Sequence, residues 1–125
     1  MATLTVLVAE DEPGVRGPVR RILTGQGYAV LEAADGAQAL RVAADHAGPI
    51  DLLLTDVVMP VMGGAELARR IRDARPEIRV LFMTAYSADA VASHGVLAPQ
   101  SSLLQKPFTV KELVGRVRAV LAEPL

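Results

Sequence analysis

Short apolar runs alternate along the chain with longer segments in which apolar residues recur at helical spacing. The short runs predict five strands, at Thr5–Ala9, Ala29–Ala33, Leu52–Asp56, Val80–Thr84 and Leu103–Lys106. The longer segments predict five helices, at about Pro13–Thr24, Gly36–Ala47, Gly64–Ala74, Ala88–His94 and Val110–Ala122. Strands that alternate with helices through short connections are typical of a parallel sheet covered by helices on both faces.

Capping and turn residues support several of these boundaries. Asp35 can cap the second predicted helix, and Thr109 with Glu112 fits a capping box at the start of the last one. Pro18 falls inside the first helix, where proline removes a backbone hydrogen bond and tends to kink the chain. The segment 95–102 contains glycine, proline and two serines. We therefore expect the fourth helix to be short and to be followed by a loop.

Polar side chains stand where four of the apolar runs end. Glu10 and Asp11 follow the first run, Asp56 ends the third, Thr84 ends the fourth and Lys106 ends the fifth. In an open parallel sheet, ligands bind outside the carboxyl ends of the strands. The strand ends therefore predict one small site that holds carboxylates, a hydroxyl and an ammonium.

The carboxylates indicate the chemistry of this site. If the first and third strands are neighbours, Glu10, Asp11 and Asp56 crowd together, and they do not all stay ionised unless a cation joins them. Carboxylate oxygens select Mg²⁺ or Mn²⁺, with water and substrate phosphate as further ligands. Lys106 suits a phosphoryl oxygen, and one carboxylate remains as the nucleophile for an acyl phosphate. Each residue alone fits a surface charge beside a buried strand, but the combination favours a metal and phosphoryl site.

Composition narrows the class of protein. A chain of 125 residues, 51% of them hydrophobic, predicts one globular domain over residues 1–125 with no room for a second. The formal net charge of -1 gives no basis for binding nucleic acid or an anionic membrane, and no apolar run approaches the roughly 20 residues that span a bilayer. The absence of cysteine excludes disulfides and thiol catalysis. The N-terminus has no signal-peptide pattern, so we expect a cytoplasmic protein.

Four segments together resemble the receiver domain of response regulators in two-component signalling. They are Glu10-Asp11, Asp56–Pro60 with Gly63-Gly64, Thr84-Ala85 and Lys106–Phe108. The resemblance covers essentially the whole chain, with the motifs in the same order and at the same spacing. The chain looks more like receivers attached to hybrid histidine kinases than like those fused to DNA-binding domains. It implies an α/β, flavodoxin-like (βα)5 fold, a doubly wound parallel sheet with strand order 2-1-3-4-5. That order places the first and third strands side by side.

The resemblance implies a set of metal ligands. Asp56 matches the phospho-accepting aspartate, which also binds the metal, and Asp11 matches a direct metal ligand. Glu10 matches the neighbouring acid that acts mostly through metal-bound water. The backbone carbonyl of Val58 matches a further ligand, so these four residues would hold Mg²⁺ or Mn²⁺.

The resemblance also implies which residues bind the phosphoryl group. Thr84 matches the hydroxyl that binds the group and moves on activation, and Ala85 is the next residue of the same motif. Lys106 matches the lysine that pairs with it. The Lys106-Pro107 peptide bond matches one that is usually cis in the family, an isomer that is plausible only before proline.

Three positions depart from the usual receiver pattern. Leu103 stands where the family usually has a tyrosine or phenylalanine that swings with the threonine, which puts the aromatic part of the switch in question. Val58 and Tyr86 stand two residues after Asp56 and Thr84, at positions that flank the path of the hydrolytic water. Neither offers an acid or amide to orient that water. We expect the phosphoryl group to persist longer here than in receivers with polar residues at these positions.

The sequence thus predicts a phospho-acceptor module. It would take a phosphoryl group onto Asp56 from a phosphohistidine, carried by a sensor histidine kinase, a phosphotransfer protein or the kinase core of the same parent chain. It would then change the face formed by the predicted helix near 88–94, the last strand and the last helix. Such a protein is an enzyme only in catalysing its own phosphorylation and dephosphorylation.

Two alternatives use the same residues differently. A Mg²⁺-dependent phosphohydrolase with an aspartyl nucleophile generally has an acid two residues past the nucleophile and a cap over the substrate. Val58 is not an acid, and 125 residues leave no cap. A pseudo-receiver would bind partners without phosphorylation, but it would normally have lost Asp11, Asp56 or Lys106, and all three are present.

Overall fold

The computed structural model describes residues 3–87, 97 and 101–123. The strands among them are β1 (Thr5–Ala9), β2 (Ala29–Ala33), β3 (Leu52–Asp56), β4 (Arg79–Thr84) and β5 (Leu103–Gln105). The helices are α1 (Pro13–Gly25), α2 (Gly36–Asp45), α3 (Gly64–Ala74) and α5 (Val110–Ala122). The helix expected near 88–94 lies outside the described residues. No helix within the described part is long and apolar enough to cross a membrane.

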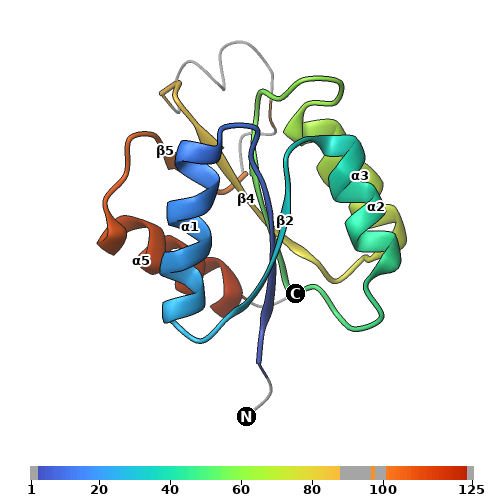
Figure 1. Cartoon of the computed structure of the whole chain (residues 1–125), viewed down its shortest axis with the longest axis horizontal. Helices are drawn as coiled ribbons and strands as arrows, with labels where there is room; N and C mark the ends of the chain where they lie inside the picture. Colours follow the sequence, from blue (N-terminus) through green and yellow to red (C-terminus); the bar gives the residue numbers. More distant parts are fainter. Residues whose placement is uncertain (1–2, 88–96, 98–100, 124–125) are drawn as a thin grey trace.

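The strands form one parallel sheet in the order β2-β1-β3-β4-β5. β1 and β3 are direct neighbours, with Leu7 opposite Leu53. Figure 1 shows α1 and α5 on one face of the sheet and α2 and α3 on the other. This arrangement confirms the expected α/β, doubly wound fold and its strand order 2-1-3-4-5.

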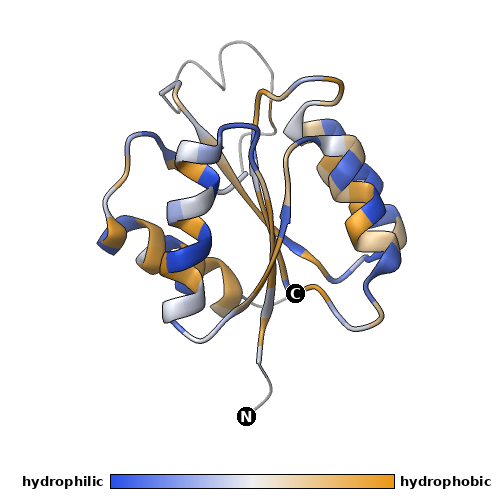
Figure 2. Cartoon of the chain, viewed as in Figure 1, coloured by the Kyte–Doolittle hydropathy of each residue, from blue (hydrophilic) through white to orange (hydrophobic). Residues whose placement is uncertain are grey.

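Successive residues of the central strands pack on opposite faces of the sheet. On β1, Val6 and Val8 belong to the apolar layer that includes α1 and α5 residues, whereas Leu7 and Ala9 belong to the layer that includes α2 and α3 residues. All four are fully buried, because a parallel sheet with helices on both faces has no face in water. Figure 2 shows the corresponding pattern, with hydrophobic strands between helices that carry hydrophilic stretches.

Two helices begin at the capping residues that the sequence predicts. The Asp35 carboxylate accepts a hydrogen bond of 2.7 Å from the Gln38 N–H at the start of α2. At the start of α5, Thr109 and Glu112 form the reciprocal capping box, with bonds of 3.0 and 2.9 Å. Each cap satisfies N–H groups that have no partner within the helix, and is worth about 1 kcal/mol.

α1 continues through Pro18 to Gly25. Proline inside a helix costs about 3 kcal/mol, because one hydrogen bond is lost and the ring clashes with the preceding turn. Beyond it, Val19 and Leu23 are 2% and 0% exposed, and burial of such side chains contributes about 1.5–3 kcal/mol each. Packing against the sheet therefore offsets the proline.

α2 ends at Asp45, two residues before the predicted Ala47. At the end of α3, Arg75 donates hydrogen bonds of 2.9 Å to three carbonyl oxygens of this region, those of Ala43, His46 and Gly48. Pro49 also disfavours the helical conformation at the residue before it. The helix therefore stops where its carbonyls find a partner outside it.

Three further bounds differ from the prediction by one residue, and the others among the described elements agree with it. α1 extends to Gly25 and β4 begins at Arg79. β5 ends at Gln105, and Pro107 has no N–H with which to continue the ladder.

Candidate functional site

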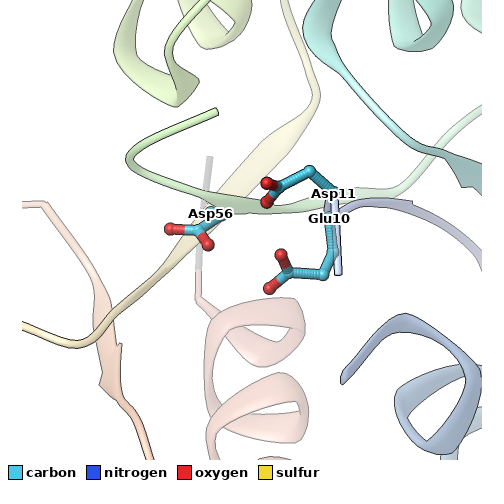
Figure 3. A group of neighbouring side chains, drawn as sticks. All are labelled: Glu10, Asp11 and Asp56. Carbon is cyan, nitrogen blue, oxygen red and sulfur yellow. The ribbon is translucent and has the colours of Figure 1, made fainter. Parts of the chain in front are cut away.

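The carboxyl ends of β1 and β3 bring three acidic side chains together. Glu10 and Asp11 directly follow β1, and Asp56 is the last residue of β3. Because these strands are neighbours, one carboxylate oxygen of each residue lies within 4.8 Å of those of the other two. Figure 3 shows the three side chains converging on one small region.

Glu10 is the buried member of this cluster, with 0% of its surface exposed. Its N–H donates to the Ala33 carbonyl at the end of β2, at 3.0 Å. Its carboxylate accepts hydrogen bonds from the Glu12 N–H at 3.2 Å and from Nζ of Lys106 at 2.5 Å. Burial raises the pKa of the Glu10 carboxyl, and these two bonds oppose the rise only in part. Burial therefore favours the neutral form of Glu10, and the Lys106 ammonium favours the charged form.

Lys106 reaches the cluster from the end of β5. Its ammonium lies 2.5 Å from Oε1 of Glu10 and 2.8 Å from Oδ2 of Asp56, and its backbone N–H donates to the Thr84 carbonyl at 2.7 Å. Burial by itself would lower the pKa of Lys106, but the hydrogen bonds to Asp56 and Glu10 outweigh burial and raise that pKa. Lys106 is therefore a protonated counter-ion of both acids. The Lys106-Pro107 peptide bond is cis, as the resemblance implies.

The charges of this cluster fit a divalent cation. Three carboxylates meet one ammonium, which leaves two formal negative charges on these four side chains. Hard carboxylate oxygens suit Mg²⁺, which takes few protein ligands and keeps several waters. The donor set is therefore compatible with the metal that the sequence predicts.

Asp56 is held by the backbone that follows it. Its Oδ1 accepts a hydrogen bond of 3.2 Å from the Val58 N–H, and its side chain is 13% exposed. Gly64, at the start of α3, lies against the Asp56 carbonyl, and a Cβ at this position would stand 2.1 Å from that oxygen. A side chain at position 64 would displace the backbone of Asp56.

Thr84 ends β4 at the border of the cluster. It is 2% exposed, and its hydroxyl oxygen accepts a hydrogen bond of 3.0 Å from the Tyr86 N–H. Among the described residues, no hydrogen bond joins the Thr84 side chain to the three acids. The structure thus brings Glu10, Asp11, Asp56 and Lys106 together directly, whereas Thr84 contacts Lys106 through its backbone.

The remaining predicted positions belong to the segments that carry the clustered residues or to their neighbours in the sequence. Val58 and Tyr86 are 61% and 59% exposed. Ala85 and Pro107 line a groove of about 460 Å³ against α1. Leu103 is half-buried and packs on the apolar layer that includes α2 and α3 residues.

Two contacts of the site are not evident from the sequence pattern. Arg16 on α1 donates from Nη1 to the Glu10 carbonyl oxygen at 2.6 Å. Its place near the start of α1 is a signal, because helical side chains point back toward the N-terminus of their helix. The second contact is the close approach of Gly64 to Asp56. The feature of the sequence that could have indicated it is the glycine pair at the start of α3.

Comparison with known proteins points to one family. The family model of the response regulator receiver domain matches residues 6–118. The chain is 39% identical to the sensor kinase CckA of Brucella abortus, over 94% of this chain and 12% of that protein. It is 34% identical to the response regulator receiver protein CpdR of the same species, over 93% of this chain and 95% of that protein. The crystal structure of the receiver domain from the hybrid histidine kinase CckA matches with a TM-score of 0.78 and 38% identity, over 94% of this chain and 98% of that one.

The match includes the parts of the chain that form the site. Residues 6–118 run from β1 into α5 and contain all three clustered acids and Lys106. The likeness to the CckA receiver agrees with the expected similarity to receivers of hybrid kinases. The chain therefore belongs to the family of receiver domains of two-component response regulators.

Proposed function

We propose that this domain accepts a phosphoryl group on Asp56 from a phosphohistidine of a sensor histidine kinase or a phosphotransfer protein. The observation that carries the proposal is the 2.8 Å contact of Lys106 with Asp56, beside the carboxylates of Glu10 and Asp11. This arrangement supplies a nucleophilic oxygen, a cation for the incoming group and acids that can hold a metal. Receiver domains interact with histidine kinases or phosphotransfer proteins, which sets the class of donor.

In the proposed transfer, a carboxylate oxygen of Asp56 attacks the phosphorus of the phosphohistidine. The new O–P bond makes an acyl phosphate. The N–P bond of the donor breaks, and its electron pair goes to the imidazole nitrogen. The donor leaves as neutral imidazole when its other ring nitrogen carries the proton. A carboxylate oxygen attacks with its own lone pair and loses no proton, so this step needs no general base.

Asp11 and Asp56 would bind Mg²⁺, with Glu10 acting through water and the Val58 carbonyl as a further ligand. When bound, the ion would neutralise charge on the phosphoryl oxygens during transfer. Glu10 would also orient Lys106, which it already contacts at 2.5 Å.

Lys106 and Thr84 would hold the phosphoryl group once it is attached to Asp56. The Lys106 ammonium would exchange its contact with Oδ2 of Asp56 for a phosphoryl oxygen, which suits a point charge on a flexible stem. The Thr84 oxygen accepts from the Tyr86 N–H, and its own O–H remains a donor for the phosphoryl group. Movement of Thr84 would then alter the face made by β5, α5 and the helix predicted near 88–94. Leu103 offers no aromatic ring, so this switch would depend on Thr84 itself.

The proposal extends to the setting of the domain. The relatives include a sensor kinase and a short receiver protein, so the donor could be the kinase core of the same parent chain or a separate protein. We place the domain in the cytoplasm, and the formal net charge of -1 supports neither nucleic acid nor membrane as a partner. Its catalysis would be limited to its own phosphorylation and dephosphorylation.

The proposal is tested by the intact mass of the purified protein after incubation with acetyl phosphate and Mg²⁺. We expect one added phosphoryl group on the wild type, none on Asp56→Asn and none in the presence of a metal chelator. Asp73→Asn is the matched control, because Asp73 is exposed on α3, and it should gain the same group as the wild type.

Two other results would contradict the proposal. No adduct and no release of phosphate would favour a pseudo-receiver that binds partners without phosphorylation. Sustained release of phosphate without an adduct would favour the phosphohydrolase.

A further inference from the structure

Arg16 connects α1 to the acidic loop that follows β1. Its Nη1 donates to the backbone carbonyl oxygen of Glu10 at 2.6 Å. The Arg16 side chain is 21% exposed, so this bond is largely shielded from water. A charged donor shielded in this way makes a stronger hydrogen bond than a neutral donor in water.

The carbonyl that Arg16 binds belongs to the peptide unit that leads into Asp11. The amide on the other side of Glu10 is fixed as well, because it donates to the Ala33 carbonyl at 3.0 Å. The peptide unit is planar, so a fixed Glu10 carbonyl also sets the direction in which the chain enters Asp11. The carbonyl that Arg16 binds thus directly precedes the backbone of Asp11.

Glu32 on β2 forms an ion pair with the same guanidinium. Nε of Arg16 lies 3.8 Å from one Glu32 oxygen, and Nε of Arg20 lies 3.4 Å from the other. Both arginines are on α1 and share this partner. In the described part of the chain, Arg16 alone of the two bonds to Glu10. Arg20 is therefore a control with the same charge, helix and ion-pair partner.

We propose that Arg16 is a positioning residue of the metal and phosphoryl site, which orients Asp11 toward the cation by holding the Glu10 carbonyl. This inference rests on the proposed function, because it concerns the Mg²⁺ site. Charge alone predicts the opposite effect, since removal of a guanidinium near a cation site lowers repulsion and tightens Mg²⁺ binding. Weaker Mg²⁺ binding after removal of the Arg16 guanidinium would therefore indicate a positioning role, and tighter binding would indicate an effect of charge alone.

The test is an NMR titration of the backbone amides with MgCl₂ in the wild type, Arg16→Met and Arg20→Met. Methionine keeps the apolar stem of arginine and removes its donors. We expect the Kd for Mg²⁺ to rise about tenfold in Arg16→Met, as for loss of an outer-shell partner of a metal ligand. Arg20→Met should stay close to the wild type. In metal-free protein, the Glu12 amide, which donates to the Glu10 carboxylate, should exchange faster in Arg16→Met alone.

The outcomes separate this inference from the proposed function. Equal Kd values in the two variants, or tighter binding by Arg16→Met, would overturn the role of Arg16, while Mg²⁺ binding by the wild type would leave the proposed function intact. A wild type that binds no Mg²⁺ would overturn both. Urea unfolding establishes that each variant is folded, and Arg16→Leu, which also has no donor, replaces Arg16→Met should the latter not fold.

Discussion

Gly64 and Asp56 lie so close together that no side chain fits between them. A Cβ at position 64 would stand 2.1 Å from the Asp56 carbonyl oxygen and 3.1 Å from its carbon. The Gly64 N–H also donates to the Val57 carbonyl at 2.9 Å. The start of α3 is thus attached to the end of β3, and a glycine positions the residue that we propose as the phosphoryl acceptor.

Gly64→Ala should lower the free energy of unfolding by about 1–3 kcal/mol, the range for forcing atoms into packed space. It should also slow phosphorylation of Asp56 by acetyl phosphate, because the backbone of the acceptor must shift. Urea unfolding and intact mass measure the two effects. Gly115→Ala on α5 is the control: its Cβ meets nothing within 4 Å, so it should be neutral or stabilising by up to about 1 kcal/mol. Similar decreases in the free energy of unfolding in both variants would show that the contact with Asp56 is not the reason for a glycine at position 64.

Val61, in the loop between β3 and α3, has a φ of 72°. A β-branched residue rarely adopts this left-handed conformation, and the side chain is 86% exposed, so little packing is lost when it is removed. Val61→Gly should therefore raise the free energy of unfolding by about 1 kcal/mol. Ala119→Gly, at an exposed position inside α5, should lower it by about 1 kcal/mol. Urea denaturation decides, and a destabilised Val61→Gly would argue against strain at this residue.

Arg75 should contribute to stability through the three carbonyls that it binds at the end of α2. Arg75→Ala should lower the free energy of unfolding by about 1.5–3 kcal/mol, the range for hydrogen bonds to a charged group. Arg72→Ala, at an exposed position on α3, should change it by less than about 0.5 kcal/mol. Thermal unfolding compares the two, and amide exchange in the last turn of α2 should rise in the first alone. Equal stability of the two variants would mean that the carbonyl contacts are not stabilising.

Val58 is expected to prolong the life of the proposed phospho-aspartate. It is 61% exposed and apolar, so it offers nothing to orient an attacking water. Val58→Asn adds an amide at this position and should shorten the half-life of the phosphorylated protein several-fold, as followed by intact mass after removal of the phosphodonor. Val58→Ala, which removes the side chain without adding an amide, is the control. Rapid decay in the wild type that Val58→Asn leaves unchanged would count against this role.

Much of the fold follows from patterns that lie within a few residues. Thr5–Ala9 and Leu52–Asp56 are short apolar runs that lead into acids, and the structure places both as central strands with these bounds. Asp35 and Thr109 cap helices as predicted, because a cap needs only the backbone N–H groups of the next turn. The convergence of Glu10, Asp11 and Asp56 follows from strand order, which the family resemblance implies.

The features that the sequence does not indicate depend on contacts between distant segments. α2 ends at Asp45, where Arg75 reaches back over 27 to 32 residues to one carbonyl in the helix and two just after it. The raised pKa of Glu10 arises from burial, which the packed sheet provides. Gly64 belongs to the family pattern, but the pattern does not explain why a glycine is required there. The explanation is the close approach of position 64 to the Asp56 backbone. Local periodicity contains none of this information.

The ion pair between Lys106 and Asp56 joins strands of very different anchorage. Asp56 ends a strand with a neighbour on each side, whereas β5 has three residues and, within the part of the chain that the structure describes, pairs with β4 alone. An edge strand this short opens locally at lower free energy than a central one. A change of charge on Asp56 would therefore displace the periphery of the sheet and leave its interior in place. Phosphorylation in the middle of the sheet would then change the structure at its edge, while the packing of the central strands stays the same.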